Sequence, residues 1–129
     1  MRTLLGSMMI SNAALFLFGA VQHAGVPMGR FHEPRIIPAA MVETLCGIAL
    51  ACGAAWMLAD SKMGWRLALI TNIVALAGVL LGIAALAAGA GPRTASNDLD
   101  HRVMLGLIGA SILILFIRRT PAPGATTRR

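Results

Sequence analysis

The sequence predicts an all-α protein, an integral membrane bundle of four helices with both termini in the cytoplasm. Of its 129 residues 57% are hydrophobic and only 12% are charged, and the mean hydropathy is +0.78. A soluble globule needs more polar surface than this composition provides. Four apolar runs, each long enough to cross a bilayer, are separated by segments rich in proline, glycine and charge.

The first apolar run predicts a helix over about 4–22. Its basic start resembles a secretory signal, but the run is too long and no small-residue cleavage site follows, so we interpret it as a retained helix. Two prolines and two glycines in the segment that follows interrupt any continuous helix. The second helix, over about 37–59, carries Pro38 in its first turn, where a missing N–H has no cost.

The third helix is expected over about 65–88, after a short polar turn flanked by Trp56 and Trp65 as in an interfacial aromatic belt. A polar connection over 93–100 leads to the fourth helix, expected over about 101–117. The bundle domain then covers 1–119. The remaining segment, 120–129, has two prolines and no large apolar residue, which predicts a disordered cytoplasmic tail.

Basic residues predict the orientation of the bundle. If both termini are cytoplasmic, seven lysines and arginines lie inside and four lie outside, as the positive-inside rule favours. The net charge of +6 could suggest nucleic-acid binding. However, the arginines lie at the ends of apolar runs and no basic face carries interleaved aromatics, so the expected partner is the lipid bilayer and no nucleic acid.

Glu43 is the least expected residue, because an ionised carboxylate inside an apolar helix is costly and usually faces a partner, water or a ligand. It lies one turn before Gly47, which begins a stripe of small residues that allows close approach of another helix. We therefore expect Glu43 to point into the bundle. Whether such small residues pack within the bundle or mark a homo-oligomer interface is left open; they are Gly47, Ala51, Ala55 and Ala59, with Gly78 and Gly82 in the third helix.

Depth along the helices selects the neighbours of Glu43, which lies about 9 Å below the outer boundary of the bilayer. The polar residues at similar depth are found at the end of the first helix and at the start of the fourth. We therefore expect a pocket open to the outer leaflet, with five ligand-binding residues: Glu43, His23, His101, Asp98 and Arg102.

The chemistry of this pocket stays open at the level of sequence. Glu43 could form a structural ion pair with Arg35, Arg102 or a histidine, or it could anchor a quinone or a lipid head. Haem or metal ligation by His23 and His101 lacks a local ligand motif, so no metal site, cofactor or catalytic residue is assigned.

The two cysteines do not suggest a disulfide or a catalytic thiol. On one helix Cys46 and Cys52 would have Cα atoms about 9 Å apart on nearly opposite faces, which is too far for a disulfide. No base neighbours Cys46 in the sequence, so a catalytic thiolate is not favoured.

The run FLFGAVQHAGVP, followed after a loop by PAAMVETLCGIALACGAAWML, resembles the first half of the DoxX-like family of small four-helix bacterial membrane proteins. The resemblance covers about the first sixty residues and does not extend to the segment 97–102. It implies a multi-pass protein of the bacterial inner (plasma) membrane; some relatives are associated with redox systems that handle quinones and thiols. The matching positions are Gly19, His23, Pro38, Glu43, Gly47, Leu50 and Gly53.

These observations predict a membrane accessory or binding protein with an outer-leaflet polar pocket around Glu43, associated with a quinone or thiol redox system and acting alone, as a homo-oligomer or in a larger membrane complex. One alternative is an oligomeric proton-coupled transporter or exporter subunit, although small exporters carry their membrane acid in the first helix and this first helix has none. Another is a metal- or haem-dependent oxidoreductase subunit, so whether the protein is an enzyme is left open.

Overall fold

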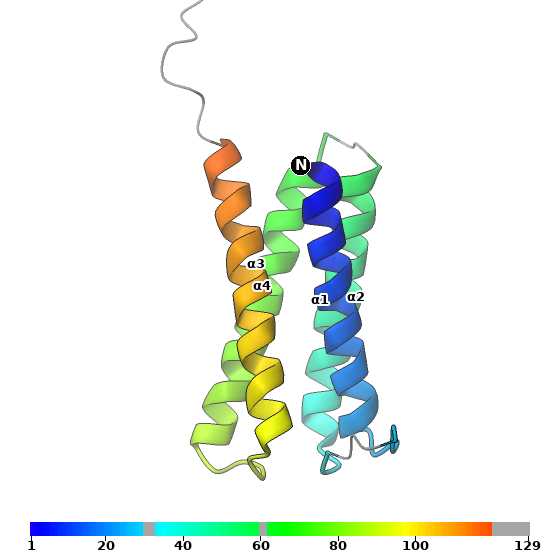
Figure 1. Cartoon of the computed structure of the whole chain (residues 1–129), viewed down its shortest axis with the longest axis vertical. Helices are drawn as coiled ribbons and strands as arrows, with labels where there is room; N and C mark the ends of the chain where they lie inside the picture. The colour runs from blue at the N-terminus through cyan, green and yellow to red at the C-terminus, as the bar shows by residue number, and fades with distance from the viewer. Residues whose placement is uncertain (30–32, 60–61, 120–129) are drawn as a thin grey trace, which may run out of the picture.

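The structure, a computed structural model, describes residues 1–29, 33–59 and 62–119. For residues 118 and 119 it describes the backbone alone. The described chain consists of four helices joined by short connections (Figure 1). They are α1 (Arg2–His23), α2 (Ile37–Leu58), α3 (Gly64–Ala87) and α4 (Ala95–Arg119). The prediction of a four-helix, all-α fold is confirmed for these residues, while the predicted disordered tail lies outside them.

The first three helices begin and end within two residues of the predicted positions, but the prediction for the fourth was wrong at its start. Helix α4 begins at Ala95 and not near 101. Thr94 caps it, because its Oγ1 accepts a hydrogen bond of 3.1 Å from the Asn97 N–H. Asp98 adds a negative charge to the first turn, where the helix dipole favours it. The polar residues 95–100, which were expected to form a connection, are therefore helical.

The helices run alternately up and down and surround a common interior (Figure 1). Helix α1 packs against α2 and α4, and α3 packs against the same two helices. The two longer connections, α1 to α2 and α3 to α4, lie at one end of the bundle, which we call the loop end. The N-terminus, the α2–α3 turn and the end of α4 lie at the opposite end (Figure 1).

The interior is filled by large apolar side chains, including the fully buried Leu5, Met9, Leu50 and Ile108. Large apolar residues also cover the outside of every helix, as a lipid-facing surface requires. By length and composition, all four helices could cross a membrane. The described fold is therefore consistent with a multi-pass membrane protein.

The small residues of α2 pack within the bundle only at the start of the expected stripe. A Cβ on Gly47 would lie 2.8 Å from Leu17 Cγ of α1, whereas Ala51 and Ala55 are exposed. A four-residue step advances about 400° around a helix, so the stripe rotates about 40° at each turn and leaves the packed face. Further along α2 the buried small residues are Gly53 and Ala54.

Candidate functional site

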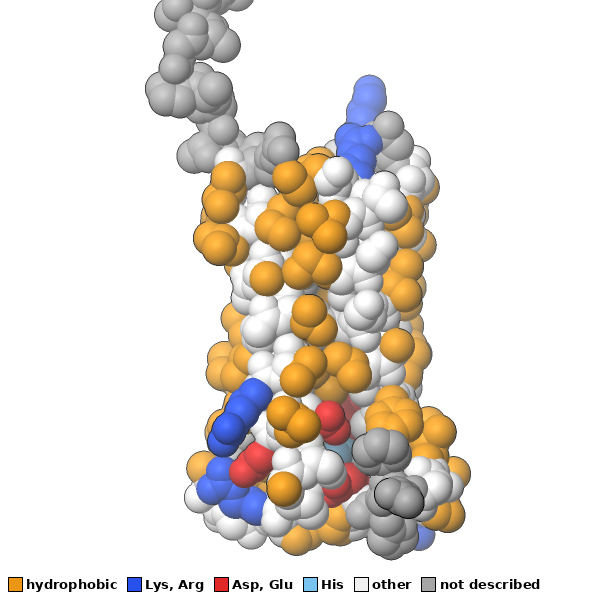
Figure 2. All heavy atoms as spheres, in the orientation of Figure 1, with side chains coloured by type: hydrophobic (Ala, Val, Ile, Leu, Met, Phe, Trp, Pro, Cys, Tyr) orange, Lys and Arg blue, Asp and Glu red, His pale blue; other side chains and the backbone are white. Residues whose placement is uncertain are grey.

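All four helices surround a cavity of about 250 Å³ at the loop end. Most of its wall is apolar, with Phe16, Val42, Val79 and Met104 among the lining residues. In Figure 2 the surface is hollowed between α1 and α4 at this end, with acidic side chains around the hollow and a histidine inside it. The polar lining residues are Gln22, His23, Glu33, Glu43, Asn97, Asp100 and His101.

The central polar contact joins His23, in the last turn of α1, to Glu43, in the second turn of α2. His23 Nδ1 lies 2.8 Å from Glu43 Oε2. Gly19 permits this approach, because a Cβ there would lie 3.0 Å from Glu43 Oε1. The Ile36 N–H also donates a 2.9 Å hydrogen bond to the His23 carbonyl, which fixes the entry to α2 beside the end of α1. The sequence allowed Arg35, Arg102 or a histidine as the ion-pair partner of Glu43. In the structure the partner is a histidine, His23.

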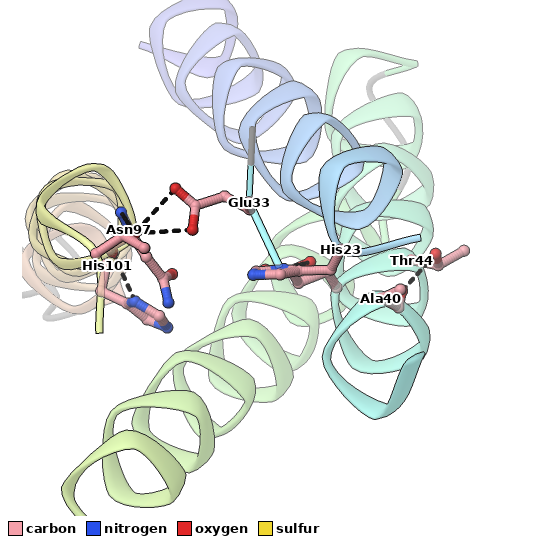
Figure 3. A network of polar contacts seen from close by, with 8 residues as sticks. His23, Glu33, Ala40, Thr44, Asn97 and His101 are labelled. Atoms are coloured by element: carbon pink, nitrogen blue, oxygen red, sulfur yellow. Dashed lines mark hydrogen bonds and ion pairs between the residues drawn. The ribbon is translucent and has the colours of Figure 1, made fainter. Parts of the chain in front are cut away.

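The second ring nitrogen of His23 is available to a ligand. A carboxylate only accepts hydrogen bonds, so Nδ1 carries the proton and Nε2 of the neutral ring is an acceptor. The residue is only 4% exposed, and its Nε2 has no hydrogen-bond partner in the described part of the chain. Figure 3 shows the ring projecting from α1 into the space between α1 and α4. A buried polar atom of this kind can accept from a hydroxyl or an amine, or donate to a carbonyl when the ring is protonated.

His101 lines the cavity from α4, across from His23 (Figure 3). Its Nδ1 lies 2.8 Å from the Asn97 carbonyl, one turn earlier, and therefore donates to that oxygen. Its Nε2 faces α3 at Gly82, where a Cβ would lie 2.6 Å away. Gly82 thus makes room for the imidazole, and the ring position depends on contacts with both α3 and α4.

Glu33 is a functional candidate that the sequence interpretation did not assign to the site. It precedes α2 and is only 6% exposed. Thr94 Oγ1 donates to both carboxylate oxygens, at 2.9 and 2.7 Å, and Ser96 Oγ donates to Oε1. The carboxylate therefore ties the α1–α2 connection to the start of α4 (Figure 3). The hydroxyls of Thr94 and Ser96 signal a helix start, but no local pattern shows that a distant carboxylate binds them.

Two predicted site residues, Asp98 and Arg102, are not among those that line the cavity. Asp98 pairs with Arg93 at 3.5 Å, and Arg102 is exposed. The reason is helical geometry: each follows an inward-facing residue, Asn97 or His101, by one position and is rotated about 100° from it. The cavity instead contains Asn97 and Asp100, which were expected to lie in a connection.

Other candidate chemistry has less support from the geometry. Within 1–29, 33–59 and 62–117, no group of three or more His, Cys, Asp or Glu side chains is arranged to hold a metal ion. Cys46 is buried beside Gly78, Cys52 is exposed, and both thiols are free. The site as described offers hydrogen bonding, negative charge and apolar surface.

No protein-family model matches the chain, and no curated protein and no solved structure matches it either. The resemblance to the DoxX-like family stays a prediction from the residues that carry it.

Proposed function

We propose that the protein is a multi-pass protein of the bacterial inner membrane that binds a small amphipathic molecule in the loop-end cavity. Both termini lie in the cytoplasm, so the cavity opens near the outer leaflet. The observation that carries this proposal is the buried Nε2 of His23, held in place by Glu43 and facing a largely apolar cavity.

The energetic argument concerns the cost of leaving that nitrogen unpaired. A buried polar atom without a partner costs roughly 1–3 kcal/mol. A ligand that bonds to Nε2 removes this cost, while its apolar part contacts the walls formed by residues such as Phe16 and Val79. Apolar walls with a few convergent polar groups are typical of small-molecule sites.

The DoxX-like resemblance makes a quinone or quinol the first ligand to test. A quinol hydroxyl can donate to the neutral His23 ring, and a quinone carbonyl can accept from the protonated ring. An anionic lipid head fits less well, because Glu33, Glu43 and Asp100 line the cavity and like charges repel. The protein would then serve as an accessory or binding protein of a membrane redox system, in a homo-oligomer or a larger complex.

The test is to identify small molecules that copurify with the chain in mild detergent, by absorbance spectrum and mass spectrometry. Wild type is expected to retain a quinone or another amphipathic molecule, and His23→Leu to lose it while eluting as a folded protein. Asp98→Asn is the control, since Asp98 pairs with Arg93 outside the cavity. The proposal fails if wild type neither retains such a molecule nor binds an added short-chain quinol.

A further inference from the structure

The loop-end cavity has an excess of negative charge. Three carboxylates line it: Glu33 from the α1–α2 connection, Glu43 from α2 and Asp100 from α4. Among the described lining residues there is no lysine or arginine, and His23 and His101 are the only groups that can become cationic. When all three carboxylates are ionised, the lining carries a net negative charge of at least one unit, even if both histidines are protonated.

The described basic side chains nearby do not supply this charge. Arg93 is paired with Asp98, and Arg102 is exposed outside the cavity. Arg35 is also exposed, and its side chain packs over Gly25 at the end of α1. Charges that are partly removed from water require a partner of opposite sign. The cavity is therefore complementary to a cation.

The hydrogen-bonding groups point to the same ligand chemistry. His23 and His101 each use Nδ1 to donate to an oxygen of the protein, so the Nε2 atoms of both neutral rings are acceptors. His23 Nε2 is the independent sign of a missing partner, because it is buried and bonded to no described residue. No described residue donates a hydrogen bond to the Asp100 side-chain carboxylate. An ammonium group has three donors and no acceptor, which matches this inventory.

We infer that the cavity selects an amphipathic molecule whose polar end is a protonated amine, with the ammonium held between the His23–Glu43 pair and Asp100 and the apolar part held by the helix walls. This inference rests on the proposed function, namely that the cavity binds a small molecule. It goes further because it ranks the possible ligands by charge: a cationic amine should bind more tightly than a neutral or anionic molecule of the same shape, such as a quinol, although a neutral molecule can still bind.

The experiment compares two probes of nearly equal shape, 1-naphthylmethylamine and 1-naphthylmethanol. Each is equilibrated by dialysis with the full chain in non-ionic detergent, and empty micelles are used to subtract partitioning. The amine is expected to bind wild type about tenfold more tightly than the alcohol, a difference of about 1.4 kcal/mol. Asp100→Asn and Glu43→Gln should each reduce this ratio to about threefold or less, because each removes one negative charge while keeping a polar side chain.

Asp98→Asn is the matched control, since it removes the same charge from the same helix outside the cavity, and its ratio should equal that of wild type. Equal binding of amine and alcohol by wild type would overturn the charge inference and leave the proposed function standing. An amine preference that survives both cavity variants, or that falls equally in Asp98→Asn, would also overturn it. If neither probe nor a short-chain quinol binds, the inference and the proposed function fail together.

Discussion

His23 Nδ1 and Glu43 Oε2 lie 2.8 Å apart and join the last turn of α1 to the second turn of α2. The contact satisfies a carboxylate in an apolar helix and at the same time fixes the imidazole in one orientation. Structural and ligand-binding roles for Glu43, which were alternatives from the sequence, are therefore compatible in the structure.

Substitution of Glu43 should separate these two roles. Glu43→Gln keeps an acceptor for His23 Nδ1, so its free energy of unfolding should differ from that of wild type by only about 0.5–1.5 kcal/mol. Glu43→Ala leaves the buried ring nitrogen unpaired and should lower the free energy of unfolding by about 1–3 kcal/mol. Reversible denaturation in mixed micelles measures both, with Thr44→Ala as an exposed control on the same helix. Equal stability of Glu43→Ala and wild type would show that the pair does not hold α1 and α2 together.

The glycines of α3 are expected to affect the bundle itself and not an oligomer interface. Gly82 faces His101, and Gly78 faces Cys46. Gly82→Leu should therefore destabilise the protein by about 1–3 kcal/mol through overpacking. Gly106→Leu is the matched control, because a Cβ at Gly106 meets nothing within 4 Å. Thermal stability and the mass of the detergent-solubilised protein should be measured together. A Gly82→Leu protein of normal stability but lower mass would instead indicate an oligomer contact.

The Glu33 carboxylate should hold the start of α4. Glu33→Ala removes the acceptor for the Thr94 and Ser96 hydroxyls. Hydrogen exchange of the amides in 95–101 should become faster, by roughly the fivefold that corresponds to about 1 kcal/mol, while exchange in α2 and α3 stays the same. Exchange rates unchanged from wild type throughout 95–101 would contradict the assigned role.

The free-energy cost of a buried polar side chain without hydrogen-bond partners can be tested at Asn12, which lies away from the cavity. Its side chain is fully buried, and both of its polar atoms lack a partner in the described ranges. Asn12→Leu should therefore raise the free energy of unfolding by about 1–2 kcal/mol. Asn72→Leu is the comparison, because it also removes a 2.8 Å hydrogen bond to the Ala68 carbonyl and should gain less. A fall in stability for Asn12→Leu would show that this amide forms a hydrogen bond when the protein is in the membrane.

The orientation of the bundle can be tested with reporter fusions. The basic residues predict a cytoplasmic reporter after Arg119 and an external reporter after Gly91, which lies before the start of α4. The opposite pattern would place the loop-end cavity at the inner leaflet.

The sequence was sufficient for the architecture, because apolar runs long enough to cross a bilayer are a strong signal and proline and glycine mark their ends. For the site it indicated that His23 and Glu43 lie at similar depth, but it left the partner of Glu43 open between Arg35, Arg102 and a histidine, and only the structure shows the contact with His23. The start of α4 was missed because polar residues were interpreted as a connection, although Thr94 followed by Ser96 and Asp98 is typical of a capped helix start.

Asp98 and Arg102 were expected in the pocket because their depth along the helix axis was considered without the direction in which each side chain points around that axis. Asp98 and Asp100 are two residues apart, yet only Asp100 lines the cavity. Sequence distance could not distinguish them until the register of α4 was known. Glu33 was missed for another reason, because its contacts with Thr94 and Ser96 span more than sixty residues and depend on the packing of the whole bundle.

The His23–Glu43 pair and the cavity draw on different parts of the chain, and this sets the order in which they can form during synthesis. The pair belongs to α1 and α2 alone, so it can form as soon as the first helical hairpin has left the ribosome. The cavity also needs α3 and α4, which supply Gly82 and His101. The nascent chain thus gives the Glu43 carboxylate a hydrogen-bond partner early, and it becomes able to bind a ligand only when its last helix has joined the bundle.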